Sequence, residues 1–305
     1  MTNPFFSIII PCYNRGSFLE RTLSSVFNQK FGDFEVLIID DGSKDDTARV
    51  VKGLQEKDPR IVYHYKENGE RGAARNFGIR NSKGKFLIFF DSDDEMLPGY
   101  LAVMHAVLEK NPGLKFLAAR YKFIRGNKIF SSSTTSMKAG LYDKDVVLKG
   151  NPFACNLCIA NNNPGLKFFE EERSLATMED WMFLVENLYS EKIFLVEEEC
   201  LLMHQHEGRS MQQDRMLIER RLKATEILTS KISFTRKESD ILLAYSYYFC
   251  SIHAFTDNDA KLAIKFIKKA INLEGLNSIF LKAYLKYIVG RRSVDRFKNL
   301  LKIGR

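Results

Sequence analysis

The sequence predicts an α/β protein with a mixed, mostly parallel sheet flanked by helices, because strand and helix signals alternate through its first 120 residues. Strands that alternate with helices of this length imply parallel pairing with right-handed crossovers. A polar cluster follows each expected strand, and open sheets of this kind bind ligands at the carboxyl ends of their strands. Beyond residue 211 only helical periodicity continues. We therefore expect a sheet domain at residues 1–210 and a basic helical C-terminal subdomain at residues 211–305.

Four strands and four helices are expected in the first part of the chain. Apolar runs predict the strands, and Pro98 and Asp45 or Asp46 indicate helix starts. The strands are expected at 6–10, 34–40, 60–65 and 86–90, and the helices at about 16–29, 45–57, 72–81 and from 98 onward. A hairpin turning at Gly126-Asn127 should add antiparallel strands. The stretch 131–167 is poor in periodicity, which predicts loops.

Composition sets the broad class of protein. The 305 residues are 45% hydrophobic, enough to bury the core of one large domain or of one large and one small domain. The N-terminus lacks a signal-peptide pattern, and no apolar run approaches the roughly 18 residues of a membrane span, so a cytoplasmic protein is expected. Five cysteines suit reduced, buried thiols, and the C-x-x-C of Cys155 and Cys158 lacks a second metal-binding pair.

The segment FFDSDDEMLP carries the strongest chemical signal. Asp91, Asp93 and Asp94 crowd into four positions directly after an apolar run. Carboxylates that close together repel one another unless a cation lies between them. Mg²⁺ and Mn²⁺ prefer oxygen ligands and often hold a diphosphate. The segment therefore predicts a divalent metal site and a phosphorylated substrate.

Two other clusters follow expected strands. In IIDDGSKDDT, Asp40 and Asp41 precede Gly42, and a carboxylate there can accept hydrogen bonds from a ribose or a nucleobase. A dinucleotide-binding fold would need G-x-G-x-x-G after the first strand, where this chain has PCYNRG. In NGERGAARNFGI, Arg71 and Arg75 lie one helical turn apart near a helix N-terminus, where cationic groups can face phosphate.

Two later motifs leave alternatives open. In MEDWMF, Glu179 and Asp180 are either functional carboxylates or helix-starting acids that interact with the helix dipole. In LMHQHEGRSM, His204 and His206 would share one face of an extended strand and could bind a metal. The same segment could instead form a surface loop.

Taken in order, five motifs resemble those of the family 2 inverting glycosyltransferases, which have the GT-A fold: SIIIPCYNR, IIDDGSKDDT, NGERGAARNFGI, FFDSDDEMLPGYL and MEDWMF. The resemblance covers about residues 5–210. It implies transfer of a sugar from a nucleotide-diphosphate donor, such as a UDP-sugar, to an acceptor hydroxyl, with Mn²⁺ or Mg²⁺ as cofactor. Cell-surface polysaccharide or glycolipid synthesis is the expected setting, with a carbohydrate or lipid-linked acceptor.

The resemblance also implies roles for individual residues. Asp180 would be the catalytic base, for which an ordinary aspartate pKa near 4 suffices. Asp93 would bind the metal, and His206 would contact metal or diphosphate, although Met203-His204 replaces the Tyr-Arg that usually precedes this histidine. The implied nucleotide-binding residues are Pro11, Tyr13, Asn14, Asp41, Arg75, Asp91 and Ser92.

Two other function classes are weighed against a transferase. A sugar nucleotidyltransferase could share the sheet, but it would need a Gly-rich loop bearing Lys or Arg after the first strand, and PCYNRGSF is not such a loop. A non-catalytic sugar-nucleotide-binding protein would keep the acidic loops without turnover. Release of free UDP from UDP-sugars would separate this class from an enzyme.

The positive charge of the chain is concentrated in its C-terminal part. Residues 211–305 carry 19 Lys and Arg against 9 Asp and Glu, whereas residues 1–210 carry 27 against 29. Residues 280–305 combine eight Lys and Arg and one acid with apolar residues at helical spacing. This segment either contacts an anionic membrane, on the inner face, or packs as a helix with a solvated basic side. Nucleic acid is not an expected partner, since no nucleic-acid-binding module accompanies the charge.

Overall fold

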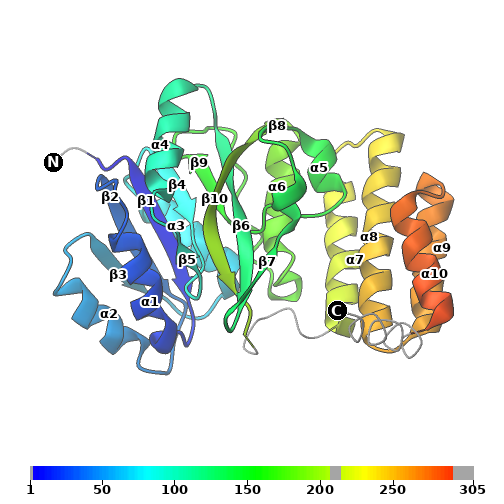
Figure 1. Ribbon diagram of the computed structural model, residues 1–305, viewed down its shortest axis with the longest axis horizontal. Helices are drawn as coiled ribbons and strands as arrows, with labels where there is room; N and C mark the ends of the chain where they lie inside the picture. The colour runs from blue at the N-terminus through cyan, green and yellow to red at the C-terminus, as the bar shows by residue number, and fades with distance from the viewer. Residues whose placement is uncertain (1–2, 207–213, 291–305) are drawn as a thin grey trace. The chain divides into compact units, whose positions relative to one another are not determined.

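The computed structural model describes residues 3–206 and 214–290 (Figure 1). The chain divides into two compact units, which are described separately. The sheet unit comprises Met1–Val147 and Asn151–Gly208, and the helical unit comprises Leu148–Gly150 and Arg209–Arg305. The predicted domain boundary at residue 210 and the end of the predicted membrane-contacting segment lie outside the described residues.

The sheet unit is built on a mixed sheet with the strand order β3-β2-β1-β4-β9-β6-β10-β5, in which β7 pairs with β6 and β8 with β10. The first four strands pair in parallel, and β9 runs antiparallel between β4 and β6. The strands are β1 Phe6–Cys12, β2 Phe34–Asp40, β3 Ile61–Tyr65, β4 Phe86–Phe89, β5 Glu95–Met96, β6 Phe116–Arg125, β7 Lys128–Ser131, β8 Gly140–Tyr142, β9 Leu157–Ala160 and β10 Ile193–His204. The predicted α/β class with a mostly parallel sheet is confirmed.

Helices accompany the sheet and make up the second unit. In the sheet unit they are α1 Gly16–Phe27, α2 Thr47–Gln55, α3 Glu70–Asn81, α4 Tyr100–Lys110, α5 Lys144–Leu148 and α6 Glu179–Leu188. The later helices are α7 Asp214–Lys231, α8 Arg236–Thr256, α9 Ala260–Glu274 and α10 Ser278–Val289. Across the described residues, none of these helices is long and apolar enough to cross a membrane.

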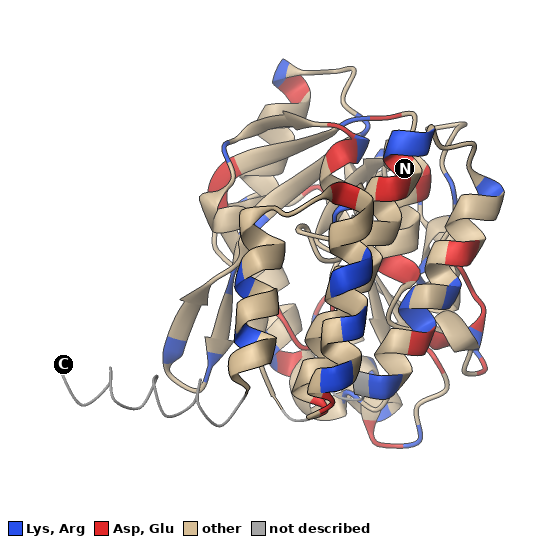
Figure 2. Ribbon diagram, turned by 90° about the vertical axis from the view of Figure 1, so that its right-hand side faces the viewer, with Lys and Arg blue, Asp and Glu red and all other residues tan. Residues whose placement is uncertain are grey.

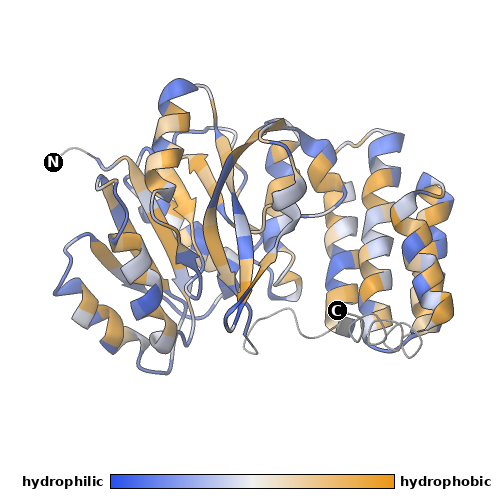
Figure 3. Cartoon of the chain, viewed as in Figure 1, coloured by the Kyte–Doolittle hydropathy of each residue, from blue (hydrophilic) through white to orange (hydrophobic). Residues whose placement is uncertain are grey.

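Alternation along the strands buries both faces of the sheet. Ile8 and Ile10 of β1 pack in one cluster with Leu19 and Leu23 of α1, while Ile9 points to the other face, as a period of two requires. There α3 approaches β1 so closely that a Cβ added at Gly78 would lie 2.3 Å from Ile9 Cγ2. Both faces are therefore covered by helices, which explains why the central strands are so apolar (Figure 3).

The helical unit has a core of its own. Phe280 and Tyr287 of α10 pack with Ile267 of α9 and Cys250 of α8 in one buried cluster. Side-chain caps define three of its helix starts: Thr235 forms a capping box with Glu238, and the carboxylate of Asp259 and the amide oxygen of Asn277 accept backbone N–H bonds. Such caps satisfy amides that a helix start leaves unpaired.

Two sequence-based expectations concern residues 121–167, and the structure confirms one and contradicts the other. The predicted hairpin is present as β6 and β7, with Gly126 at φ +56 in its turn. The prediction of loops across 131–167 is wrong, because this stretch contains β8, α5 and β9. Strand β9 spans only four residues, too few for a period to be recognised, and its stability comes from pairing with a strand on each side.

Candidate active site

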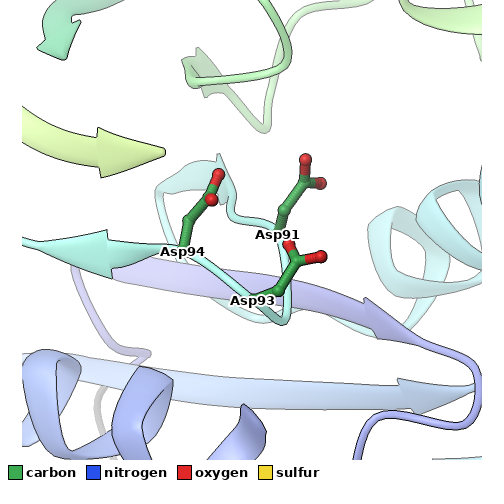
Figure 4. A group of neighbouring side chains, drawn as sticks. All are labelled: Asp91, Asp93 and Asp94. Atoms are coloured by element: carbon green, nitrogen blue, oxygen red, sulfur yellow. The ribbon is translucent and has the colours of Figure 1, made fainter. Parts of the chain in front are cut away.

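The turn after β4 brings three carboxylates together (Figure 4). Asp91, Asp93 and Asp94 each offer an oxygen, and these atoms lie within 4.8 Å of one another. Helix α1 holds the turn in place: Thr22 Oγ1 donates to the carbonyls of Ser92 and Asp94, both at 3.0 Å. Only carboxylate oxygens make up this donor set, which fits a hard cation such as Mg²⁺ or Mn²⁺.

Donors and cations surround these acids in the described structure. Asp93 Oδ2 lies 2.9 Å from His206 Nε2 and 3.6 Å from Arg15 Nη2. Asp94 Oδ1 accepts the backbone N–H of His204 at 2.9 Å. The two residues predicted to bind metal, Asp93 and His206, are thus in direct contact. Arg15 and His206 thus place basic side chains beside Asp93 in a turn that carries three acids.

The two histidines of the LMHQHEGRSM motif do not share a carboxylate. Strand β10 ends at His204, whose Nε2 lies 2.7 Å from Glu95 Oε1. His206 lies beyond the strand, reaches Asp93 and stacks on Phe18, with ring centroids 4.9 Å apart. The expectation of one shared face was based on a strand that continues through both residues, and the strand stops before the second.

A buried arginine connects the acidic turn to α6. Arg75 is 1% exposed, its Nη2 lies 3.0 Å from Asp91 Oδ1, and its Nη1 lies 3.1 Å from Glu179 Oε1. Arg71 Nε lies 3.2 Å from the same Glu179 oxygen. This Asp91–Arg75–Glu179 bridge joins residues 104 positions apart in sequence. The predicted nucleotide-binding Arg75 therefore has both terminal nitrogens on carboxylates.

Asp180 lies in the first turn of α6, beside Glu179. Its Oδ2 accepts a hydrogen bond from Asn151 Nδ2 at 3.0 Å, and its Oδ1 accepts one from the backbone N–H of Trp181 at 2.7 Å. Burial, followed by the negative charge of Glu179, raises the pKa of Asp180 to about 6, although Arg75 and Arg71 oppose the shift. This pKa is higher than the ordinary value expected from the sequence, yet it leaves the group mostly ionised at neutral pH.

Glu179 differs from its neighbour because it touches two guanidinium groups. Burial works against its ionisation, but Arg71 and Arg75 together hold the pKa of Glu179 below its usual value. Glu179 therefore favours its ionised form within its ion pairs, whereas Asp180 can exchange a proton near neutral pH. This division of roles between two adjacent acids could not be predicted from their motif.

Asp41, directly after β2, anchors the loop that follows β3. Its carboxylate is buried and accepts hydrogen bonds from Lys66 Nζ at 2.6 Å, from the Gly69 amide at 2.9 Å and from Asn68 Nδ2 at 3.1 Å. The Asp41 amide in turn donates to the carbonyl of Cys12 at 2.9 Å. The ends of β1 and β2 and the loop after β3 thus meet at Asp41.

The loop after β1 interlocks with the loop after β2. Pro11 is buried in the strand, and Tyr13 is 45% exposed. Asn14 adopts φ 52, its amide donates to Ser43 Oγ at 2.9 Å, and its Oδ1 accepts the Lys44 amide at 2.8 Å. A left-handed conformation at Asn14 is tolerated because its short side chain bonds locally. An exposed aromatic ring on a fixed loop is a suitable surface for a nucleobase.

Sequence reasoning missed several residues that complete this site. Arg15 directly follows the PCYN loop, so its position pointed to the site even though its contact with Asp93 could not be foreseen. Asn151 lies in the stretch interpreted as featureless loops. Lys66 directly follows β3, at the carboxyl end of a strand, where the sequence predicts the ligand-binding edge of the sheet.

Together, the fold and the sequence define the class of protein. Residues 7–167 match the model of Glycosyl transferase family 2, which is more than half of the 305 residues. The chain therefore belongs to this family, and its sheet and flanking helices form a GT-A fold. The resemblance inferred from the five motifs is confirmed.

Individual relatives match parts of the chain. A GalNAc(5)-diNAcBac-PP-undecaprenol beta-1,3-glucosyltransferase of Campylobacter jejuni is 32% identical over 203 residues, covering 63% of this chain and 62% of that protein. The glycosyltransferase GlyA of Streptococcus pneumoniae is 34% identical over 99 residues, covering 32% of this chain and 14% of that protein. The chain thus spans less than two thirds of the length of these curated relatives.

Solved structures share the fold at lower identity. S. aureus TarS 1-349 aligns with a TM-score of 0.67 at 18% identity, covering 93% of this chain and 89% of that one, and the complex of TarS 1-349 with UDP-GlcNAc gives the same values. The mannosyltransferase PcManGT from Pyrobaculum calidifontis, in complex with GDP-Man and Mn²⁺, aligns with a TM-score of 0.58 at 15% identity, covering 92% and 79%. At these identities the likeness shows the fold alone.

Proposed function

We propose that this chain transfers a sugar from a nucleotide-diphosphate donor to an acceptor hydroxyl, with inversion at the anomeric carbon. The Asp91–Arg75–Glu179 bridge carries the proposal, because it ties a carboxylate cluster suited to metal to the turn that holds Asp180. Family membership supports the transferase class, and similar folds that bind UDP-GlcNAc or GDP-Man with Mn²⁺ support a nucleotide-sugar donor.

Asp180 acts as the base in this proposal. It accepts the proton of the acceptor hydroxyl as that oxygen bonds to the anomeric carbon, while Asn151 and the Trp181 amide hold the carboxylate in orientation. A base with a pKa of about 6 accepts this proton more readily than an ordinary aspartate and remains largely ionised at pH 7. Attack from the side opposite the nucleotide inverts the configuration.

The donor diphosphate is held at the acidic turn. Asp91, Asp93 and Asp94 would bind Mn²⁺ or Mg²⁺, with His206 in contact with Asp93. Such an ion supplies positive charge against the negative charge that grows on the leaving diphosphate. Arg15 adds a second positive charge near Asp93. In this proposal the nucleoside of the donor is bound by Pro11, Tyr13, Asn14, Asp41 and Ser92.

We further propose a lipid-linked or carbohydrate acceptor, since the C. jejuni relative is named for a glycan on undecaprenol diphosphate. Cell-surface polysaccharide or glycolipid synthesis remains the proposed setting. The cytoplasmic location expected from the sequence stays a prediction.

A donor panel read by nucleotide release tests the function. The unmutated chain is incubated with UDP-, GDP- and dTDP-sugars in Mn²⁺, in Mg²⁺ or in EDTA, with Asp180→Asn as the matched control. We expect release of one nucleotide that is lost in EDTA and in the variant. If no nucleotide is released from any donor, even when cell extracts are added to supply acceptors, a binding protein would be favoured. Pyrophosphate formation from a sugar phosphate and a nucleoside triphosphate would favour a nucleotidyltransferase.

A further inference from the structure

Helix α10 is apolar on two sides, of which the core covers only one. Its inward side contributes Phe280, Ala283 and Tyr287 to the buried cluster of the helical unit. Its outward side carries Leu281 at 39% exposure, Leu285 at 52%, Ile288 at 56% and Val289 at 57%. A second apolar side that faces away from the core calls for a partner.

The exposed residues form one continuous stripe. Positions 281, 285 and 288 follow the spacing i, i+4, i+7, which places them along one face of a helix. Val289 lies beside this stripe and is exposed as well. Single exposed apolar residues are ordinary, whereas a contiguous patch marks an interaction surface.

Positive charge flanks the stripe. Lys282 and Lys286 are exposed one helical turn apart beside it, and α10 contains no acidic residue. Helix α9 adds four exposed lysines, Lys261, Lys265, Lys268 and Lys269, against the single acid Glu274. In Figure 2, Lys and Arg positions recur along the helices nearest the viewer. The chain that follows α10 continues the trend, with six Lys and Arg and one Asp in residues 291–305.

We propose that the outward face of α10 docks the protein on an anionic lipid surface. An amphipathic helix with apolar residues along one side and lysines beside them matches a bilayer whose acyl region lies beneath negative head groups. A second copy of this chain would bring like charges together beside the stripe, so the single sign of charge favours an anionic surface over self-association. Each lysine adds to the attraction and the apolar side chains insert, so both components contribute to binding. The inference goes beyond sugar transfer and does not depend on it.

Flotation with vesicles of stated composition tests the proposal. The full chain is mixed with vesicles of phosphatidylcholine and phosphatidylglycerol in equal parts, or of phosphatidylcholine alone. We expect binding to the anionic vesicles, weakened by high salt, and roughly tenfold weaker binding to neutral ones. Failure of the full chain to bind anionic vesicles at low salt overturns the proposal.

Variants assign the binding to α10. The triple change Leu281→Gln, Leu285→Gln and Ile288→Gln should weaken vesicle binding by at least about tenfold, given the apolar area removed. The matched control, Met216→Gln with Ile252→Gln, changes exposed apolar residues on α7 and α8 of the same unit and should bind normally. Equal loss in both sets overturns the assignment.

A charge-reversal double variant keeps the test independent of folding. Lys282→Glu with Lys286→Glu leaves the apolar stripe intact and should reduce binding to anionic vesicles while leaving the far-UV circular dichroism unchanged. Nucleotide release from soluble donors should remain within about twofold in every variant, so failure of the docking proposal is distinguishable from failure of the proposed function. A dimer by light scattering that dissociates only in the triple variant would identify a second copy as the partner and overturn the proposal.

Discussion

At the scale of single residues, the site depends on two adjacent carboxylates that differ in their neighbours. Glu179 touches Arg71 and Arg75, whereas Asp180 accepts hydrogen bonds from Asn151 and the Trp181 amide. The arginines lower the pKa of Glu179, while burial and Glu179 itself raise the pKa of Asp180. Neighbouring groups whose pKa values are driven apart in this way commonly take different chemical roles.

The first prediction concerns the base. Asp180→Asn keeps the shape of the side chain and removes its basicity, so kcat should fall by about 10²–10⁴-fold. Affinity for the nucleotide sugar should stay within several-fold, because the donor is held elsewhere in the site. Steady-state kinetics and calorimetry check the two halves of this prediction. Retention of more than about a tenth of kcat would reject the role of Asp180 as base.

The second prediction is a pH profile. Only the ionised carboxylate accepts a proton, so kcat/KM should decline as the pH falls below about 6, the pKa of Asp180. Glu179→Gln removes the neighbouring charge that raises this pKa, and the acid limb should therefore move to lower pH. Initial rates from pH 4.5 to 8 measure the acid limb of the pH profile in the unmutated chain and in the Glu179→Gln variant. An unchanged limb in the Gln variant would show that another group controls it.

The third prediction concerns the acidic turn. Asp93→Ala removes an oxygen ligand and should abolish the part of nucleotide affinity that depends on Mn²⁺. Asp33→Ala, at an exposed acid of the same unit, serves as the control and should leave that affinity unchanged. Calorimetry with and without Mn²⁺ provides the measurement. Equal affinity in both conditions for the unmutated chain would contradict metal dependence itself.

At the scale of elements, the strands with unbroken apolar runs and the hairpin were predictable, whereas β5, β8, β9 and β10 were not. Strands β1, β2 and β4 are buried on both faces, so their sequences are unbroken apolar runs that stand out. In strand β10 the alternation of apolar and polar residues is interrupted at Glu197, Glu198 and Glu199. The pairing of β10 with β6 changes register in the same region. Extended residues at a bulge do not alternate regularly, so no period of two could be detected.

Local sequence patterns likewise predicted only part of the candidate site. The motifs located the acidic turn and Asp180 because each follows a recognisable strand or begins a helix. The Asp91–Arg75–Glu179 bridge could not be predicted, since 104 positions separate Arg75 from Glu179 and local spacing carries no information on such contacts. The raised pKa of Asp180 follows from burial, which is equally invisible to a sequence motif.

The fourth prediction compares two helical glycines. Gly78→Ala should destabilise the sheet unit by about 1–3 kcal/mol, because the new Cβ would lie 2.3 Å from Ile9 Cγ2. Gly53 in α2 has no neighbour within 4 Å of an added Cβ, so Gly53→Ala should stabilise by about 0.5–1 kcal/mol. Urea unfolding followed by Trp181 fluorescence measures both. Equal effects at the two sites would show that helix propensity, not the close approach of α3 to β1, decides the outcome.

At the scale of the whole molecule, each of the two units has a hydrophobic core of its own among the described residues, and the single tryptophan, Trp181, lies in the sheet unit. Phe280→Ala should destabilise the helical unit by about 3–5 kcal/mol. The urea midpoint from far-UV circular dichroism should then fall further than the midpoint from Trp181 fluorescence. Coincident shifts of both midpoints would show that the units unfold as one cooperative block.

Because Arg75 is buried between two carboxylates, the order of synthesis limits when the nascent chain can complete this part of the site. A ribosome adds roughly 5–20 residues per second, so the 104 residues from Arg75 to Glu179 take about 5–20 s to synthesise. Throughout that interval Arg75 lacks one of its two carboxylates and remains hydrated. Nascent chains should therefore gain the ability to hold a donor only after α6 has emerged, however early β1 to β4 assemble.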